Sequence, residues 1–230
     1  MTRPRASRPV LFFDLDDTLH DASHAILGVL NRRMTEYVQH HLELGEAEAS
    51  DLRQVYWHRY GATLLGLTRH HAIDPHHFLR ETHAFDVAAL LRAERGLTAF
   101  LRRLAARKVL LTNAPHAYAH TVVRELDLHR QLAQRYTIES MRVHGQFRPK
   151  PSLLMLRTML ARERCRRGRA VLIEDSRANL KAARAAGFRT VLISPTLPHR
   201  ARTPGRPAYV DLRLRSVRDL PRALARLGRG

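Results

Sequence analysis

The chain has 230 residues, 44% of them hydrophobic, which is enough for one domain with a real core or for one domain carrying an insertion. No apolar run approaches the roughly 20 residues that a membrane-spanning helix needs, and the single cysteine, Cys165, excludes an internal disulfide. A short basic start leads almost at once into a predicted strand, unlike a signal or transit peptide, so we expect a cytoplasmic protein without a membrane partner.

The formal net charge of +19 is unevenly distributed. Residues 20–96 hold eight arginines and ten acidic residues, whereas the remainder holds the other 32 of the 40 basic residues and 11 of the 21 acidic residues. The arginines are scattered over predicted helices without interleaved aromatic residues, which is unlike a nucleic-acid-binding stripe. We therefore expect no specific nucleic-acid partner, although non-specific adhesion at low salt follows from the charge.

The first predicted strand, Val10–Phe13, is an uninterrupted apolar run, as expected for a strand buried on both faces of a parallel sheet. Three carboxylates follow within four positions, at Asp14, Asp16 and Asp17. They would lie at the carboxyl end of the strand, where open α/β sheets bind their ligands. Acids this close repel one another unless they share a cation, and oxygen ligands suit Mg²⁺. This stretch therefore predicts a metal-assisted phosphoryl-transfer site.

Helical patterns fill the region after the first strand. The spacing of apolar residues predicts long helices over Ala25–Leu44 and Glu46–Leu67, and shorter ones over Pro75–Thr82 and Asp86–Arg92. No strand pattern interrupts them. The sequence therefore predicts an all-helical domain over 20–96, inserted into a core domain made of residues 1–19 and 97–230.

Strand and helix patterns alternate from Gly96 onward. Strands are predicted over Val109–Thr112, Tyr136–Glu139, Ala170–Ile173, Thr190–Ile193 and Val210–Leu214. Helices are predicted over Leu97–Ala106, Pro115–Leu126, Leu153–Arg164, Arg177–Ala186 and Leu220–Leu227, with loops over 145–152 and 195–207. This alternation predicts an α/β fold with a Rossmann-like, doubly wound parallel sheet.

Further polar residues lie at the ends of these elements. Thr112 and Asn113 end a strand and can donate hydroxyl and amide hydrogen bonds to phosphate oxygens, although the pair is also typical of a helix cap. Lys150, between two prolines and before a helix, is suited to stabilising the attacking and leaving charges. Glu174 and Asp175 end a buried strand, where adjacent acids are costly unless a cation or hydrogen bonds offset them. We expect these groups to meet in one crevice.

In order and spacing, these residues resemble the four motifs of the haloacid dehalogenase-like (HAD) phosphohydrolases: Asp14-x-Asp16-x-Thr18, then Thr112-Asn113, Lys150 and Glu174-Asp175. The resemblance implies that Asp14 is a nucleophile that forms an aspartyl-phosphate, and that Asp16 is the general acid and base. It implies that Lys150 is catalytic, and that Thr18, Thr112 and Asn113 bind the phosphoryl group.

The same resemblance implies Mg²⁺ as the cofactor. By the family's pattern, Asp14, the backbone carbonyl of Asp16 and Asp175 would hold the ion, and Glu174 would act through a metal-bound water. Asn179 is a plausible neighbour of this ligand set.

The helical insertion resembles the C1-type cap of this superfamily, which closes over the catalytic face. A Tyr-Trp-x-x-Tyr-Gly-x-x-Leu-x-Gly-Leu helix and a His-His-x-Ile-Asp-Pro turn resemble the pyrimidine 5′-nucleotidase branch. That branch implies hydrolysis of nucleoside monophosphates such as UMP or CMP. Aromatic, arginine and histidine side chains could read a base, although each also fits a helical core or a solvated loop; the candidate substrate residues are Tyr56, Trp57, Arg59, Tyr60 and His70.

Two alternatives to a nucleotidase remain open on sequence grounds. The same site could serve a phosphomutase or a phosphatase for another sugar or cofactor phosphate. A basic protein that uses the HAD core to bind nucleic acid, or to remove its end phosphates, is the alternative from a different class.

Overall fold

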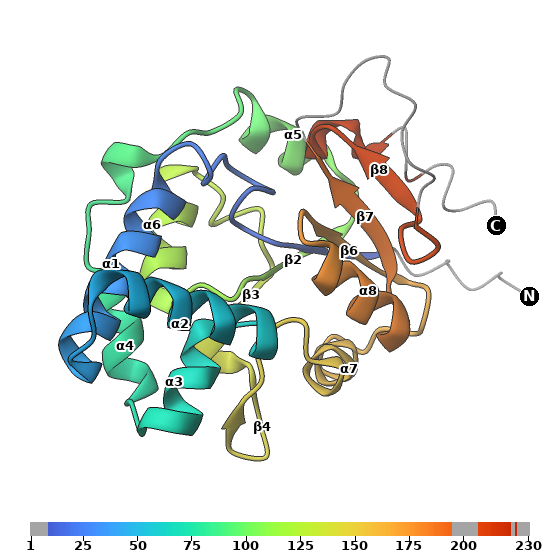
Figure 1. The fold of residues 1–230 in the computed structure, drawn as a ribbon. Coiled ribbons are helices and arrows are strands. Elements are labelled where there is room, and N and C mark those ends of the chain that lie inside the picture. Colours follow the sequence, from blue (N-terminus) through green and yellow to red (C-terminus); the bar gives the residue numbers. More distant parts are fainter. Residues whose placement is uncertain (1–8, 195–206, 222–223, 225–230) are drawn as a thin grey trace, which may run out of the picture.

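The computed structural model describes residues 9–194, 207–221 and 224. Six parallel strands form one sheet in the order β3-β2-β1-β6-β7-β8 (Figure 1). Their bounds are Val10–Phe13 for β1, Arg107–Leu111 for β2, Gln134–Tyr136 for β3, Ala170–Glu174 for β6, Arg189–Ile193 for β7 and Leu212–Leu214 for β8. The order reverses between β1 and β6, which is the point where doubly wound sheets bind their ligands.

Helices cover both faces of the sheet, as the apolar sequence of β1 predicts. Leu11 and Phe13 belong to a hydrophobic cluster that includes residues of α5 (Leu97–Arg103) and α6 (His116–Glu125). Phe12 belongs to a second cluster, on the opposite face, with residues of α7 (Leu153–Arg162) and α8 (Arg177–Ala186). Alternate side chains of one strand therefore anchor two helical layers. The expected Rossmann-like α/β fold is confirmed.

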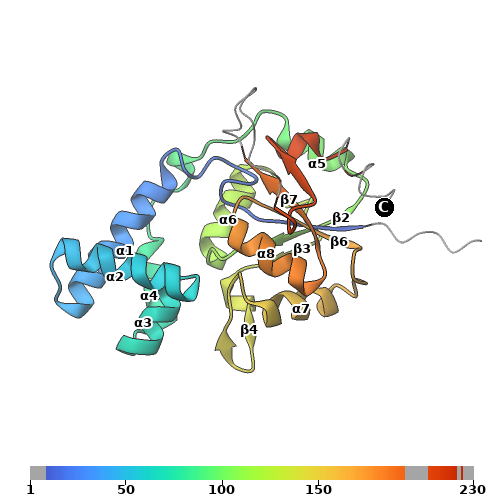
Figure 2. The same cartoon turned by 45° about the vertical axis from the view of Figure 1, so that its right-hand side comes forward.

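Four helices between β1 and α5 form a group of their own beside the sheet, here called the helical insertion (Figures 1 and 2). They are α1 (Ile26–Leu42), α2 (Glu46–Tyr60), α3 (Thr63–His71) and α4 (Pro75–Thr82). Their apolar faces share a separate hydrophobic cluster that includes Val38, Leu67 and Phe78. Because Ile138, from the loop after β3, joins this cluster, the insertion packs against the sheet domain.

The predicted helix over Glu46–Leu67 is wrong in one respect, because it is two helices. The chain turns at Gly61, where α2 ends with φ at 80° and the amide donates to the Trp57 carbonyl. A Cβ at Gly61 would lie 2.7 Å from Cδ of Pro151, so the sheet domain also requires a glycine at this position. The periodicity of apolar residues continues across Gly61 and hides the break.

Three shorter elements also differ from the sequence prediction. The helix predicted over Asp86–Arg92 is only a 3₁₀ turn, η1 (Ala88–Leu90). The strand predicted over Tyr136–Glu139 is β3 followed by another 3₁₀ turn, η2 (Ile138–Ser140). The loop over 145–152 contains half of a small hairpin, β4 (Arg142–Val143) with β5 (Gln146–Phe147). Each is too short for a periodic pattern to specify.

The C-terminal part of the chain is described only in pieces. The predicted strand over Val210–Leu214 is β8, and a 3₁₀ turn, η3 (Val217–Asp219), follows it. The loop predicted over 195–207 and most of the helix predicted over Leu220–Leu227 lie outside the described residues. None of the described helices combines the length and the apolar character that crossing a membrane requires.

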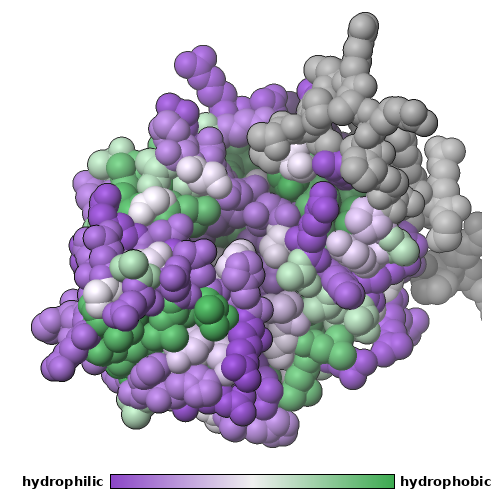
Figure 3. Space-filling view, viewed as in Figure 1, coloured by the Kyte–Doolittle hydropathy of each residue, from purple (hydrophilic) through white to green (hydrophobic). Residues whose placement is uncertain are grey.

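The surface between the insertion and the sheet domain is mixed in character. In the face shown by Figure 3, hydrophobic residues gather over the insertion and again over α7, with a polar strip between them. Leu153 and Leu154 of α7 are exposed, as are Val55 and Trp57 of α2.

Candidate active site

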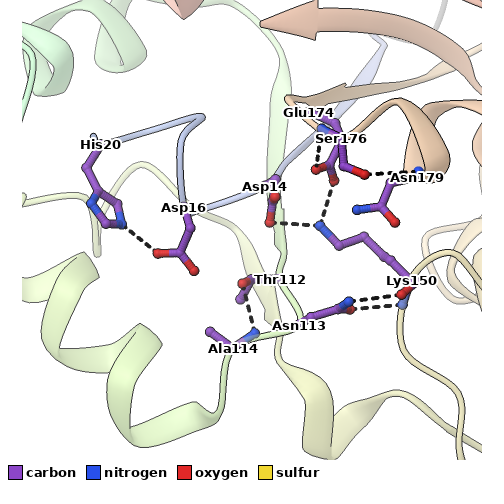
Figure 4. A network of polar contacts seen from close by, with 10 residues as sticks. All are labelled: Asp14, Asp16, His20, Thr112, Asn113, Ala114, Lys150, Glu174, Ser176 and Asn179. Carbon is purple, nitrogen blue, oxygen red and sulfur yellow. Dashed lines mark hydrogen bonds and ion pairs between the residues drawn. The ribbon is translucent and has the colours of Figure 1, made fainter. Parts of the chain in front are cut away.

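Acidic side chains from two neighbouring strands meet at the switch point of the sheet. Asp14 follows β1 and Glu174 ends β6 (Figure 4), and Asp175 comes directly after Glu174 in the chain. One carboxylate oxygen of each residue lies within 4.8 Å of the others. Because β1 and β6 are paired in register, Phe13 opposite Ile173, the acids that follow them are brought side by side.

Lys150 bridges two of these carboxylates. Its Nζ lies 2.7 Å from Oδ1 of Asp14 and 2.7 Å from Oε2 of Glu174, and the side chain is 1% exposed. The amide of Asn113 fixes the backbone of this lysine: its Nδ2 donates to the Lys150 carbonyl, and its Oδ1 accepts from the Lys150 amide, both at 2.9 Å. The Asn113 side chain is predicted to bind phosphate, but one of its N–H donors and its carbonyl oxygen already bind the Lys150 backbone.

The three acids Asp14, Glu174 and Asp175 carry more negative charge than Lys150 alone can neutralise. Burial raises the pKa of Asp14 well above its ordinary value; Glu174 adds to this effect and Lys150 opposes it. Burial also raises the pKa of Glu174 and the pKa of Asp175. For Lys150, burial lowers the pKa, but the charges of Asp14 and Glu174 outweigh burial and hold its pKa above the ordinary value. One buried lysine faces three buried or half-buried acids.

This donor set fits a hard divalent cation such as Mg²⁺. All three side chains offer carboxylate oxygens, and a cation would favour their charged forms against the burial and mutual repulsion that raise their pKa values. Glu174 already accepts hydrogen bonds from Lys150 through Oε2 and from the Ser176 amide through Oε1. Asp14 and Asp175 accept fewer hydrogen bonds from the described residues than Glu174 does, so their oxygens are the more available ones for a metal ion.

The side chain of Asp16 is held by two residues that the sequence alone did not single out for this purpose. Its Oδ1 accepts a hydrogen bond from the Tyr118 hydroxyl at 2.6 Å and lies 2.9 Å from Nε2 of His20 (Figure 4 shows the histidine). Oδ2 takes no hydrogen bond from the described residues. Two donors on one oxygen fix the carboxylate and leave the other oxygen available for proton transfer.

The two threonines lie in different surroundings. Thr112 is buried at the end of β2, and its Oγ1 accepts from the Ala114 amide at 3.1 Å, so its hydroxyl proton can still be donated. Thr18 is also buried, but its hydroxyl has no partner among the described residues, and it lies outside the linings of the cavities described below. The chain turns sharply before it, with Asp17 at φ 55°.

Two adjoining cavities open between the acidic cluster and the helical insertion. The first, about 490 Å³, is lined by Asp14, Asp175 and Asn179 from the sheet domain and by Trp57, Arg59 and Tyr60 from α2. The second, about 540 Å³, is more apolar and lies deeper against the insertion. Both linings include Asp16, Asn113 and Trp57, so the cavities are continuous around these residues.

The five candidate substrate residues divide into two sets. Trp57, Arg59 and Tyr60 line the cavities. Tyr56 and His70 do not; the Tyr56 ring packs between α2 and α3, so close to Gly66 that a Cβ there would lie 2.1 Å from the tyrosine Cγ. The Tyr56 hydroxyl contacts Nε2 of His71 at 2.7 Å. For Tyr56, the alternative of helical packing describes the observed contacts better, whereas His70 is exposed in the last turn of α3 and contacts the Tyr60 hydroxyl at 2.6 Å.

The sheet order and the position of the acids define a Rossmann-like α/β core with its site at the switch point. Residues 9–187, most of the chain, match the family described as haloacid dehalogenase-like hydrolase, and the chain belongs to this family.

A curated relative is Phosphate metabolism protein 8 of Saccharomyces cerevisiae, 30% identical over 71 residues. That match covers 31% of this chain and only 22% of the yeast protein, so the chain spans about a fifth of the length of this relative.

Solved structures of similar fold agree with the family assignment. A HAD phosphatase from Thermococcus onnurineus has a TM-score of 0.61 and 16% identity, over 94% of this chain and 97% of that one. The HAD hydrolase YfnB of Bacillus subtilis has a TM-score of 0.61 and 15% identity, over 95% and 99%. Its structure is described as bound to magnesium and as revealing interdomain movement. At these identities the likeness shows the fold.

Proposed function

We propose that this chain is a Mg²⁺-dependent phosphomonoester hydrolase that works through an aspartyl-phosphate intermediate. The observation that carries the proposal is the bridge from Lys150 to Asp14 and Glu174, with Asp175 beside them. A buried cation next to a buried carboxylate lets that carboxylate approach an anionic phosphoryl group. A structural ion pair alone would not require a third acid at the same place.

In this mechanism Asp14 is the nucleophile. Its carboxylate oxygen attacks phosphorus, and the bond from phosphorus to the leaving oxygen breaks as the acyl-phosphate forms. Lys150 and the Thr112 hydroxyl offset the negative charge that the phosphoryl oxygens carry through this step.

Asp16 is the general acid and then the general base. It gives a proton to the departing oxygen, and later takes one from the water that attacks the phosphorus of the acyl-phosphate and releases inorganic phosphate. Tyr118 and His20 hold its other oxygen, so that Oδ2 performs both transfers.

Asp14, Asp175 and the backbone carbonyl of Asp16 would hold the metal, with Glu174 behind them. The ion, when bound, supplies positive charge that neutralises the phosphoryl group during attack. The site residues of this chain provide the oxygens and orient them.

The proposed substrate is a nucleoside 5′-monophosphate, with pyrimidine nucleotides first among them. The support is the resemblance of the Tyr56–Leu67 stretch and the His70–Pro75 turn to pyrimidine 5′-nucleotidases, together with the deeper cavity beside Trp57. A cavity of about 540 Å³ with mainly apolar walls and a few polar groups suits a small organic leaving group.

We further propose that residues 20–96 act as a cap domain that moves over a core of residues 1–19 and 97–230. Support comes from the separate hydrophobic cluster of the insertion and from the interdomain movement described for YfnB. The cavities lie between the two parts, so this movement would admit substrate and exclude water.

The test is a panel of phosphate esters, with released phosphate measured with and without Mg²⁺. The panel includes UMP, CMP, their deoxy forms, sugar phosphates and phenyl phosphate. We expect Mg²⁺-dependent turnover that is highest on the nucleotides, and a loss of about a thousandfold or more in Asp14→Asn. Asp21→Asn, which removes an exposed acid seven residues along the chain, is the matched control and should keep full turnover.

Two results would contradict the proposal at different levels. Full activity of Asp14→Asn would refute the aspartyl-phosphate mechanism. Turnover of sugar phosphates but of no nucleotide would refute the substrate class, leave the phosphatase core standing, and favour the sugar-phosphate alternative.

A further inference from the structure

A histidine that the mechanism does not use lies in the deeper cavity. His83 comes directly after α4 and lines this cavity together with Asp16 and Tyr118. Its ring meets the Tyr118 ring edge to face, with 5.6 Å between the centroids. The side chain is half-buried, and it belongs to none of the four family motifs.

The contacts of His83 fix which nitrogen carries the proton. Nδ1 lies 3.0 Å from the Leu79 carbonyl and 3.0 Å from the Thr82 hydroxyl oxygen. A carbonyl can only accept, and the Thr82 hydroxyl already donates its proton to the Phe78 carbonyl. Nδ1 must therefore be the donor, and in the neutral ring Nε2 is left with its lone pair.

The ring is neutral at physiological pH. Burial lowers the pKa of His83 to about 4, while the Leu79 carbonyl and the charge of Asp16 only partly oppose this. Nε2 takes no hydrogen bond from the described residues, yet it is not sealed in the interior. The cavity is thus lined by a fixed hydrogen-bond acceptor to which none of the described residues donates.

The position of this acceptor indicates which part of a ligand would meet it. His83 packs against Tyr118, whose hydroxyl contacts Asp16, the group that would protonate the leaving oxygen. A ligand group beside His83 is therefore close to the scissile bond. In a nucleoside 5′-monophosphate that region is the ribose, whose hydroxyls are donors.

A second polar residue of the same cavity suits the rest of such a ligand. Arg53 of α2 donates to Oδ1 of Asn31 at 2.9 Å and to Oγ1 of Thr35 at 3.3 Å, and it forms no ion pair with any described residue. Burial lowers the pKa of Arg53, as expected for a cation without a carboxylate partner. Its remaining donors are available to the carbonyl oxygen of a base.

From these contacts we infer that Nε2 of His83 accepts a hydrogen bond from a ribose hydroxyl and so selects ribonucleotides over phosphate esters that lack this hydroxyl. The inference rests on the proposed function, because it assigns a specificity residue to that site. His83 is not placed in the chemistry of phosphoryl transfer.

The experiment compares two substitutions of one residue. His83→Met removes the acceptor and keeps an unbranched side chain of similar length, whereas His83→Gln keeps an oxygen that can accept. For each, kcat and KM are measured on UMP, 2′-deoxy-UMP, 3′-deoxy-UMP and phenyl phosphate. In the wild type we expect kcat/KM to fall about tenfold or more on one of the two deoxy analogues.

We expect the ratio of kcat/KM on UMP to that on phenyl phosphate to fall about tenfold in His83→Met and to recover substantially in His83→Gln. On the deoxy analogue that the wild type discriminates against, His83→Met should have the same kcat/KM relative to phenyl phosphate as the wild type. His40→Met, an exposed histidine of α1, is the control and should leave every ratio unchanged.

Three results would overturn the inference. If folded His83→Met keeps the wild-type ratio of kcat/KM on UMP to kcat/KM on phenyl phosphate, the inference is wrong while the nucleotidase proposal stands. If the wild type has equal kcat/KM on UMP and on both deoxy analogues, the inference is wrong, and no variant is needed to show it. Turnover of phenyl phosphate but of no nucleotide would refute the proposed substrate class and the inference together.

Discussion

The residues around Asp16 show what the sequence could and could not specify at the scale of single side chains. Asp14, Lys150 and Asp175 follow strands or precede a helix, and the rule that ligands bind at the carboxyl ends of parallel strands brings them together. Tyr118 and His83 could not be predicted in this way. Tyr118 lies in α6 and His83 comes directly after α4, and their places beside the site depend on tertiary contacts such as the one between their two rings.

The first prediction concerns Tyr118, whose hydroxyl is one of two donors to Oδ1 of Asp16. Tyr118→Phe keeps the buried ring but frees the carboxylate to rotate. We expect kcat to fall about tenfold with KM nearly unchanged, because general acid–base catalysis as a whole contributes about 10²- to 10⁴-fold. Steady-state kinetics on the best phosphate ester measures both constants.

The matched control removes a hydroxyl at a distance from the site. Tyr136 of β3 donates to Oε1 of Glu163 at 2.8 Å, so Tyr136→Phe loses a comparable hydrogen bond. We expect its kcat to stay at the wild-type value. Equal losses in the two variants would mean that Tyr118 acts through stability and not through Asp16.

The second prediction concerns the pH dependence of stability. Because burial holds the pKa of His83 at about 4, against 6.5 in an unfolded chain, only the unfolded state takes up this proton between those values. The contribution of His83 is complete above pH 6.5 and is lost as the pH falls toward 4. At pH 5 the free energy of unfolding should therefore be about 2 kcal/mol lower than at pH 7 because of His83 alone.

Urea unfolding at pH 7 and pH 5 tests this prediction in wild type and His83→Gln. The free energy of unfolding should drop by about 2 kcal/mol less in the variant, since the other histidines contribute equally to both proteins. If both drop by the same amount, the His83 ring is protonated in the folded protein and the prediction is wrong.

At the scale of elements, the sequence predicts strands better than helix boundaries. The buried strands are short, uninterrupted apolar runs, and each predicted core strand exists within a few residues of its expected place. The break at Gly61 was missed because it depends on Pro151, ninety residues away, which leaves no room for a side chain. A local pattern cannot report such a tertiary constraint.

The third prediction compares two glycines within helices of the insertion. A Cβ at Gly66 of α3 would lie 2.1 Å from Cγ of Tyr56, whereas a Cβ at Gly28 of α1 would meet nothing within 4 Å. Gly28→Ala should therefore stabilise the protein by about 0.5–1 kcal/mol, the ordinary gain in a helix. Gly66→Ala should destabilise it by about 1–3 kcal/mol, because Tyr56 must move.

Thermal unfolding of the two variants measures both effects, with the wild type as reference. Both variants carry the same glycine-to-alanine substitution, so opposite changes in their stability would report on the surroundings of the two positions. A stabilised Gly66→Ala would show that Tyr56 is free to leave the interface between α2 and α3, and would reopen its candidacy as a substrate residue.

At the scale of the whole molecule, the uneven charge follows the division between insertion and sheet domain. Residues 20–96 are nearly balanced, while the excess of arginine lies elsewhere in the chain. Several of these arginines are paired with acids on the surface, as Arg107 is with Glu163 and Arg184 with Asp211. Arg53 and Arg59 are the arginines that line the two cavities, so the insertion adds positive charge there to that of Lys150 from the sheet domain.

The pairing of β1 with both β2 and β6 has a consequence for biosynthesis. The hydrophobic cluster of the insertion comes almost entirely from residues 37–79, so these helices can pack while the nascent chain is still short. Val10, by contrast, pairs with Ala170. Asp14 therefore cannot meet Asp175 until most of the polypeptide has left the ribosome, and a product that ends before β6 would have no catalytic centre.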